Sequence, residues 1–452
     1  MNAAALILTV PVTVLLGCSG AGSVAVPPEV PPEVQPEVPP ELQPAASPIA
    51  PPTADVPDVV LVSVDTLRAD RLSAWGYERD TSPNLDALAA SALRFDRAVA
   101  PAPWTLPSVT SLFTGRMPSQ HGVVSRDWSL SPSALTLAER AREAGYEAAF
   151  FGVNAAFVTG HGLDQGFETW QPFSGLSGRQ LNRRVLDFLS ARDDPRPLFL
   201  VVHYFEPHCR YNPPRDVADR YLPDPATHVP QPLDPADYES MGDCFRLQQP
   251  DGSPELDRAI YRARYDAEVR EVDRLIGELW GAVAAREPWL GVVADHGEAF
   301  WEHGAHGHGS QLYDEQIRVP MLVRPPGGVS PVVVPHAVST LWLTDAAAAA
   351  FTAQPAPPYP PVAFSETDYG GVSLRAAQSV HSKLIRDRSA GSDEGLDLAD
   401  DPAERSPRSG DGAFAALAAA LDEQLAIPAG IAESRDRGDG EAEKLRALGY
   451  VE

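Results

Sequence analysis

Residues 58–65 read DVVLVSVD, and this stretch decides the fold. Its continuous apolar, mostly β-branched run is typical of a strand that is buried on both faces of a parallel sheet. Asp65 follows the run directly, and in open α/β sheets functional groups gather beyond the carboxyl ends of the strands. Asp65 is therefore a candidate metal ligand, although a single Asp at such a place is more often a turn or N-cap residue.

Further strands and helices are predicted along the chain. Apolar stretches predict strands at 146–151, 197–204, 290–294 and 318–323, and helical spacing predicts helices at 83–95, 136–145 and 259–285. Because strands and helices alternate over 58–326, we expect an α/β fold with helices layered on both faces of a sheet. Beyond it, residues 364–366 and 383–385 predict short antiparallel strands, and the Ala-rich stretch 413–425 predicts a helix.

The N-terminal region predicts export. Residues 3–17 form an apolar run that is too short to span a bilayer comfortably and suits the core of a signal peptide. The run ends in Leu15-Leu16-Gly17-Cys18, which resembles the bacterial lipobox with its lipidated Cys; a plain secretory signal is the alternative, since no Lys or Arg precedes the run. Pro-rich residues 26–52 predict an extended spacer. We expect a lipid-anchored protein of the bacterial cell envelope that faces the periplasm or the exterior.

Composition limits the partners. A net charge of −26, from 36 basic and 62 acidic residues, excludes nucleic acid and argues against a broad basic face for anionic lipids. An anionic substrate would need a local positive centre, such as a metal ion. The cysteines, Cys18, Cys209 and Cys244, show no CxxC spacing, which argues against a structural zinc site. In an oxidising compartment, a lipidated Cys18 would leave Cys209 and Cys244 as a possible disulfide pair.

Two more segments carry chemistry-bearing side chains. In APAPWTLPSVTSLFTGRMPSQHG (100–122), Pro107-Ser108 can begin a helix, so Thr105 would sit just before a helix N-terminus, which stabilises developing negative charge. A hydroxyl there beside a metal could ionise and attack, whereas a Thr alone would be an N-cap. Six of the eleven histidines lie close to two strand ends, which favours metal ligation. They are His203, His208, His296, His303, His306 and His308.

Together these residues resemble the sulfatase family of the alkaline-phosphatase superfamily. The similar segments cover most of the chain after the spacer: VSVDTLRADRLSAWGY (62–77), SPNLDALA (82–89), TLPSVTSLFTG (105–115), HGV (121–123), AGYEAAFFG (144–152), HYFEPHCRYNPP (203–214), ADHGEAF (294–300), HGHGSQLYDEQIRVPMLVRPPG (306–327), DLADDPAE (397–404) and KLRALGYVE (444–452). The resemblance implies a three-layer α/β/α, alkaline-phosphatase-like catalytic domain and a smaller C-terminal α+β subdomain. The expected segments are a signal peptide at 1–17, a spacer at 18–56, the catalytic domain at 57–354 and the subdomain at 355–452.

The resemblance also implies roles for single residues. Asp65, Asp295 and His296 match metal ligands of the family. Thr105 matches the nucleophile that opens its C/S-x-P-S-R motif, and His208 matches a residue that contacts the sulfuryl or phosphoryl oxygens of the substrate. By analogy with Thr-nucleophile members, one divalent ion (Zn²⁺, Mn²⁺ or Ca²⁺) would be held by Asp65, Thr105, Asp295 and His296.

Four features of true sulfatases are absent. Thr105 cannot become formylglycine, which needs Cys or Ser, and Val109 replaces the Arg of the motif. Thr66 replaces the usual second Asp, and Val153-Asn154-Ala155 replaces a Lys-Trp-His stretch. A Thr nucleophile is what the phosphodiesterases and phosphoethanolamine transferases of this superfamily use. We therefore expect no formylglycine and favour phosphoester or phosphotransfer chemistry.

Neighbouring side chains would complete the reaction. The metal would lower the pKa of the Thr105 hydroxyl, and His208 and Asn154 would share the oxyanion charge. His308 or His303 would protonate the leaving alcohol. Two single roles remain open: Arg68 is a candidate substrate contact or a structural ion pair, and a second ion would need further ligands such as Glu206, His303 and His308.

Two other functions compete with phosphoester cleavage. One is a true sulfuric ester hydrolase, and the other is an inactive, lipid-anchored binding protein on the same scaffold. Retention of Asp65, Thr105, Asp295 and His296 together argues against the binding protein. The expected substrate is a small-molecule, glycan or lipid ester, and the sequence identifies neither its alcohol nor the oligomeric state.

Overall fold

The computed structural model describes residues 56–158, 160–209, 211–222, 258–408, 412–430 and 432–434. The predicted signal peptide, Cys18, the spacer up to residue 55, Cys244 and the tail 444–452 lie outside the described residues. None of the helices in the described ranges is long and apolar enough to cross a membrane.

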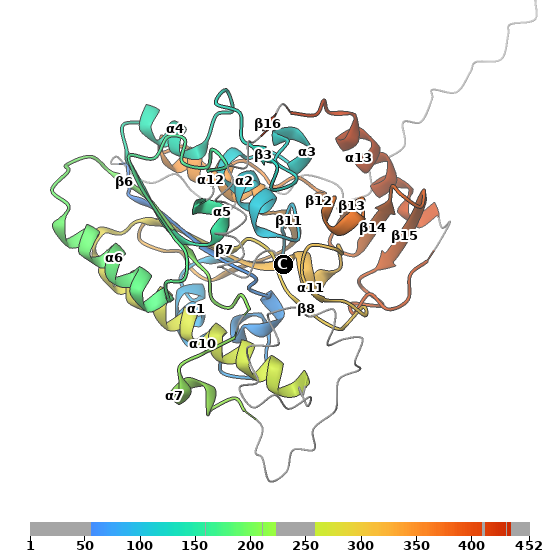
Figure 1. Ribbon diagram of the computed structural model, residues 1–452, viewed down its shortest axis with the longest axis horizontal. Helices are drawn as coiled ribbons and strands as arrows, with labels where there is room; N and C mark the ends of the chain where they lie inside the picture. The colour runs from blue at the N-terminus through green and yellow to red at the C-terminus, as the bar shows by residue number, and fades with distance from the viewer. Residues whose placement is uncertain are drawn as a thin grey trace, which may run out of the picture. The chain divides into compact units, whose positions relative to one another are not determined.

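A sheet of eight strands forms the centre of the main domain, in the order β11-β2-β10-β7-β1-β6-β4-β5 (Figure 1). The strands are β1 (Val59–Val64), β2 (Leu93–Val99), β4 (Glu147–Val153), β5 (Thr169–Phe173), β6 (Leu198–Tyr204), β7 (Trp289–Ala294), β10 (Arg318–Arg324) and β11 (Val332–Ser339). Only β10 among them runs antiparallel to its neighbours. Every residue of β1 is buried, which explains why its sequence is apolar without alternation.

Helices cover the sheet in two sets. α1 (Pro83–Ala89) and α6 (Gly178–Ala191) both pack on the long helix α10 (Arg258–Val283), and α2 (Thr105–Thr114) and α4 (Leu137–Glu143) pack on α12 (Leu341–Ala350). Figure 1 shows these two sets on opposite sides of the sheet. Shorter helices are α3 (Pro118–His121), α5 (Ala155–Val158), α7 (Arg215–Ala218) and α11 (Asp314–Ile317). The predicted three-layer α/β/α domain is confirmed.

One predicted helix is wrong in its second half. The helix expected over residues 83–95 ends at Ala89, and Leu93–Val99 is strand β2. The apolar residues Leu85, Leu88 and Leu93 fit a helical period, but Leu93 and Phe95 are buried two residues apart, as in a strand. Pairing with β10 and β11 on either side decides the strand conformation, and the local sequence does not show that pairing.

The C-terminal part is the predicted α+β subdomain. Four antiparallel strands form its sheet: β12 (Ala363–Thr367), β13 (Leu374–Gln378), β14 (Ser382–Asp387) and β15 (Ser392–Asp397). Helix α13 (Ala415–Ala426) packs against β13 and β14. The edge strand β12 is joined to the main domain because Glu366 N–H donates to the Pro101 carbonyl (2.8 Å) and Ser365 Oγ donates to the Ala100 carbonyl (2.6 Å).

A buried cation ties the subdomain to the main domain. The Lys383 side chain on β14 is fully buried, with Nζ 2.6 Å from Asp314 Oδ1 and 2.5 Å from Glu404 Oε1. Burial, together with the charge of Asp314, raises the pKa of Glu404 to about 7. Asp314 is also paired with Arg97 of β2, at 2.7 Å.

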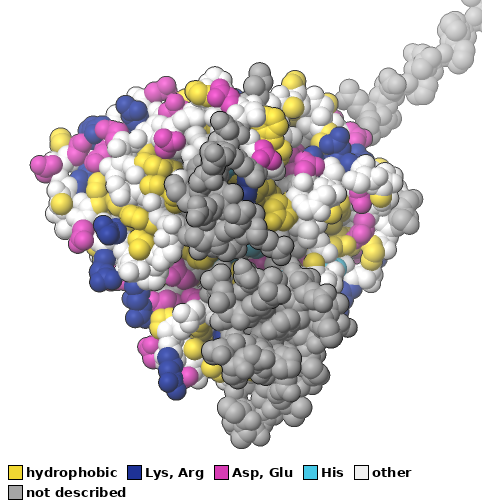
Figure 2. Space-filling view, viewed as in Figure 1, with side chains coloured by type: hydrophobic (Ala, Val, Ile, Leu, Met, Phe, Trp, Pro, Cys, Tyr) yellow, Lys and Arg dark blue, Asp and Glu magenta, His cyan; other side chains and the backbone are white. Residues whose placement is uncertain are grey.

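On the surface, Asp and Glu side chains are interspersed with Lys and Arg side chains over the described part of the face in Figure 2.

We expect Lys383→Met to destabilise the protein by about 3 kcal/mol or more, because it leaves the buried carboxylates of Asp314 and Glu404 without their shared cation. Denaturant unfolding followed by circular dichroism measures this loss. The matched control is Arg408→Met, which removes an exposed cation paired with Asp397 and should cost less than about 1 kcal/mol. Equal losses for the two variants would contradict a structural role for the Lys383 network.

Candidate functional site

Three adjacent strands bring the candidate ligands to one edge of the sheet. Strand β1 is hydrogen-bonded to β7 on one side and to β6 on the other, with all three parallel. Asp65 therefore emerges between Asp295-His296, which follow β7, and His203, which lies near the end of β6 and is the register partner of Ser63. The carboxyl ends of parallel strands meet at one edge, so residues far apart in sequence become neighbours.

Two carboxylates, Asp65 and Asp295, lie fully buried at this edge. Asp295 Oδ1 accepts backbone N–H bonds from Thr66 (3.2 Å) and His296 (2.8 Å), and Asp65 Oδ2 accepts from Asn154 Nδ2 (2.7 Å). The remaining oxygens, Asp65 Oδ1 and Asp295 Oδ2, are buried and have no hydrogen-bond partner within the described part of the chain. Buried polar atoms are nearly always satisfied in proteins, so these oxygens indicate a ligand.

The electrostatics of the pair indicate a cation. Burial and the neighbouring charge of Asp65 raise the pKa of Asp295 well above its usual range. Burial would also raise the pKa of Asp65, but the nearby His208, His203 and His296 lower it below its usual range. Two carboxylates that repel each other in a buried place are stabilised when a positive ion binds between them.

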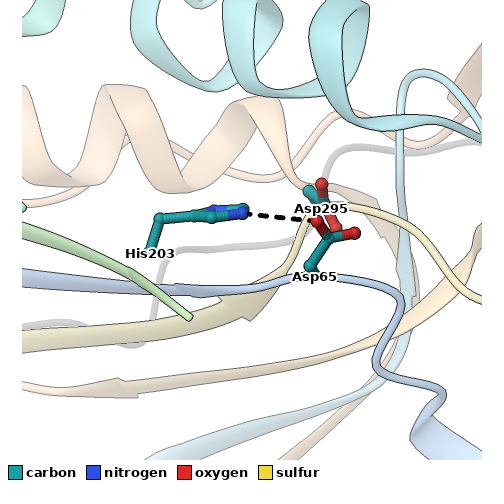
Figure 3. A group of neighbouring side chains, drawn as sticks. All are labelled: Asp65, His203 and Asp295. Atoms are coloured by element: carbon teal, nitrogen blue, oxygen red, sulfur yellow. Dashed lines mark ion pairs between the residues drawn. The ribbon is translucent and has the colours of Figure 1, made fainter. Parts of the chain in front are cut away.

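Two histidines supply imidazole nitrogens beside the carboxylates. His203, Asp65 and Asp295 each offer one ligand atom, and these atoms lie within 4.8 Å of one another (Figure 3). His203 Nδ1 is 3.0 Å from Ser63 Oγ, while its Nε2 has no hydrogen-bond partner in the described ranges and lies 3.7 Å from Asp65 Oδ2. His203 is one of the six clustered histidines of the sequence, and no individual role was predicted for it.

His296 is oriented as a metal ligand would be. Its Nδ1 lies 2.9 Å from the Gly297 carbonyl and donates to it, which leaves the lone pair on Nε2. That nitrogen is 3.5 Å from Asp65 Oδ1 and 3.6 Å from Asp295 Oδ2. Burial lowers the pKa of His296 to about 3, so the ring is neutral. Carboxylate oxygens with neutral imidazoles suit a divalent ion such as Zn²⁺ or Mn²⁺, and the residues present therefore fit the predicted metal.

Thr105 is held against this group by its helix. It is the first residue of α2, so the helix begins two residues before the predicted Pro107-Ser108 start. Thr105 Oγ1 lies 3.3 Å from His296 Nε2. In the first turn of the helix, Ser108 Oγ donates to the Asp295 carbonyl (2.5 Å), which fixes α2 to the end of β7. The structure thus brings Thr105, Asp65, Asp295 and His296 together, as predicted.

The turn after Asp65 is strained and pinned. Thr66 has φ +54, a left-handed conformation that is uncommon for a β-branched residue. Tyr265 of α10 supports it, because its hydroxyl donates to the Thr66 carbonyl (2.7 Å) and accepts from Arg68 N–H (2.9 Å). The Arg68 guanidinium is buried and paired with Asp70 and Glu302, each at 2.7 Å. Arg68 therefore forms the structural ion pairs that were one of its two predicted roles. The other role, a contact with the substrate, stays a prediction.

Two further histidines flank the group. The His308 ring centroid is 4.5 Å from that of His296 and 5.1 Å from that of His208. Burial lowers the pKa of His308, but Glu298, whose Oε1 is 2.9 Å from Nδ1, raises it more, so the net shift is upward. Burial lowers the pKa of His208. The Nδ1 atom of His208 lies 2.6 Å from the Cys209 carbonyl oxygen. Two neighbouring imidazoles thus have pKa values shifted in opposite directions, with that of His308 raised and that of His208 lowered.

Other predicted residues lie elsewhere. His303 stacks on Tyr313 with its Nδ1 2.7 Å from Glu315 Oε1, at the boundary with the subdomain. Glu206 accepts from Gly178 N–H at the start of α6 (2.7 Å). Cys209 is disulfide-bonded, and because both other cysteines lie outside the described residues, its pairing with Cys244 stays a prediction.

Comparison with known proteins agrees with this architecture. The chain is 25% identical over 317 residues to an uncharacterized sulfatase of Escherichia coli, covering 60% of this chain and 63% of the relative. It is 25% identical over 341 residues to mouse iduronate 2-sulfatase, covering 62% and 61%. The chain thus spans about three fifths of the length of these curated relatives.

A solved phosphonate monoester hydrolase of Agrobacterium radiobacter shares the fold, with a TM-score of 0.65, 20% identity and coverage of 82% of this chain and 94% of that one. The model of the Sulfatase family matches residues 57–352, which contain Asp65, Thr105, His203 and Asp295-His296. This match extends over more than half of the chain, and the chain therefore belongs to the sulfatase family.

Proposed function

We propose that this protein is a metal-dependent hydrolase that cleaves phosphate or sulfate esters with Thr105 as the nucleophile, and that phosphoesters are its preferred substrates. One observation carries the proposal: the Thr105 hydroxyl lies 3.3 Å from His296 Nε2, beside two buried carboxylate oxygens without hydrogen-bond partners in the described chain. An inactive binding protein would have no need to keep this arrangement.

The metal would be held by Asp65, Asp295 and His296, with Thr105 and His203 close enough to join. A divalent ion at such a place lowers the pKa of a neighbouring hydroxyl and offsets the negative charge of the transition state. Asn154 holds Asp65 Oδ2 in position through its 2.7 Å hydrogen bond. The role of Asn154 is thus to orient a ligand, besides any contact with the substrate.

The chain's own groups account for the proton and charge movements. The Thr105 hydroxyl would release its proton to solvent as it ionises, and Oγ1 then forms a bond to phosphorus or sulfur while the bond to the leaving alcohol breaks. The leaving oxygen takes a proton from His308, whose pKa is raised by the neighbouring Glu298 carboxylate. The N–H groups at the start of α2 and the neighbouring His208 stabilise the anionic oxygens. Water then hydrolyses the Thr105 ester and restores the hydroxyl.

The preference for phosphoesters rests on the nucleophile. Formylglycine forms only from Cys or Ser, so Thr105 would act as a plain alcohol, as does the Thr nucleophile of the phosphodiesterases in the same superfamily. The alternative substrate is a sulfate ester, which is supported by the names of the relatives, such as iduronate 2-sulfatase. We propose a glycan, lipid or small-molecule ester as the substrate, cleaved at the cell envelope by a protein anchored through Cys18.

Activity assays separate these alternatives. The full chain, supplied with Zn²⁺, Mn²⁺ or Ca²⁺, should hydrolyse p-nitrophenyl phosphate or bis(p-nitrophenyl) phosphate with a higher kcat/KM than p-nitrophenyl sulfate. A higher value for the sulfate would show that a Thr nucleophile serves sulfate esters here. No hydrolysis with any metal would contradict the proposed activity and favour a binding protein.

We expect Thr105→Ala to lower kcat/KM for the preferred ester by at least about 10³-fold, because it removes the attacking oxygen. Thr105→Ser retains a hydroxyl and should keep measurable activity. Thr114→Ala is the matched control: it removes a buried Thr hydroxyl at the other end of α2, bonded only to the Thr110 carbonyl. A Thr105→Ala protein with wild-type turnover would exclude Thr105 as the nucleophile.

We expect Asp295→Asn to abolish stabilisation by the metal while leaving the metal-free protein at least as stable as wild type. The substitution removes the repulsion between Asp65 and Asp295 but also removes a ligand charge. Wild type should gain about 2.7 kcal/mol at a metal concentration a hundred times Kd. Thermal unfolding with EDTA and with added metal measures both effects, and Asp345→Asn on α12, paired only loosely with Arg140, is the control. An unchanged metal response in Asp295→Asn would exclude Asp295 as a ligand.

A further inference from the structure

One aromatic side chain of the C-terminal subdomain reaches the proposed active site. Tyr369 begins the short 3-10 turn η5 (Tyr369–Gly371), which follows β12, and 41% of the residue is exposed. Its ring centroid is 5.2 Å from that of the buried Trp104, which directly precedes Thr105. A Cβ placed on Gly309 would lie 2.8 Å from Tyr369 Cδ1, so the ring rests on the backbone next to His308. Tyr369 therefore packs on the residue that directly precedes Thr105 and on the residue that directly follows His308.

The turn that carries Tyr369 is fixed to both domains. Thr367 Oγ1 donates to the Gly309 carbonyl (2.6 Å) and accepts from Tyr369 N–H (3.2 Å). Asp368 is paired with the buried guanidinium of Arg375 at 2.8 Å. A ring held in this way loses little conformational freedom when a ligand stacks on it, and such preorganisation favours binding.

The same turn leaves space next to the ring. Gly370 and Gly371 both have positive φ, at +68 and +84, and a Cβ on either would meet no atom within 4 Å. The two residues after Tyr369 thus carry no side chain that could cover the exposed part of its ring. An exposed large aromatic residue that is rigidly supported is typical of a recognition surface.

We infer that Tyr369 forms the leaving-group subsite and stacks on a ring of the ester's alcohol. This inference rests on the proposed function, in which Thr105 attacks and His308 protonates the leaving oxygen. A leaving oxygen held at His308 places its substituent next to Gly309, and the Tyr369 ring lies on that residue. The chemistry that fits an exposed aromatic face is a flat ring with apolar C–H or π surface, either an aryl group or the face of a pyranose.

The test compares esters that differ only in the alcohol: phenyl, pyranosyl and methyl esters of the preferred acid, with the full-length protein and its metal. Tyr369→Ala should lower kcat/KM for at least one ring ester by about threefold to tenfold, and Tyr369→Phe should restore it. Methyl ester turnover should be unchanged in both variants. Loss with the phenyl ester alone identifies an aryl alcohol, and loss with the pyranosyl ester alone identifies a sugar.

Two results would overturn the inference. An equal loss of kcat/KM in Tyr369→Ala for the methyl and the ring esters would show that Tyr369 only supports the fold of the site. An unchanged kcat/KM with every ester would show that the ring makes no contact with the substrate. Calorimetric binding of phenylphosphonate and methylphosphonate gives a readout that does not need turnover, and Tyr369→Ala should reduce the preference for the phenyl compound. Failure of the proposed function would appear instead as an inactive wild-type protein. The matched control is Val333→Ala. Val333 is exposed and lies at the start of β11, at the amino end of the parallel strands, whereas the site lies at their carboxyl end.

Discussion

Two carboxylates buried side by side at the carboxyl ends of β1 and β7 impose the constraint on which the site depends. Removing a charge from water costs several kcal/mol, and two like charges in contact add repulsion to that cost. The fold offsets part of this cost. Backbone N–H groups donate to the Asp295 carboxylate, the Asn154 side-chain amide donates to the Asp65 carboxylate, and several histidines lie near Asp65. The two oxygens without partners in the described chain are what a cation would complete.

The same constraint explains the positions of the catalytic groups. Helix α2 is fixed to the end of β7 through Ser108 and the Asp295 carbonyl, so Thr105 has to face His296. The strained turn at Thr66 directs its N–H to Asp295 and is held by Tyr265.

The C-terminal subdomain takes part in the site instead of merely extending the chain. Lys383 joins the subdomain to Asp314 of the main domain, and β12 is hydrogen-bonded to the segment before α2. These contacts hold Tyr369 next to Trp104 and Gly309. Under the proposed function, the sheet would hold the reaction centre and the subdomain would contribute to recognition of the alcohol.

The sequence by itself determined the α/β class, five of the eight strands of the main sheet, two of the four strands of the C-terminal sheet, and the helices α1, α2, α4, α10 and α13. It also singled out Asp65, Thr105, Asp295 and His296, which the fold brings together. Strong local patterns carry that information: apolar runs for buried strands, and polar residues placed directly after them. Tertiary structure alone decided that Leu93–Val99 is a strand, that His203 lies beside Asp65, and that Arg68 and His303 are held in ion pairs. It also brought Tyr369 against Trp104, the residue before Thr105. These outcomes depend on which strands pair and which charges meet in the folded chain. Some of the ion pairs are local in sequence, as between Arg68 and Asp70 or His303 and Glu315, and others join residues more than two hundred apart, as between Arg68 and Glu302.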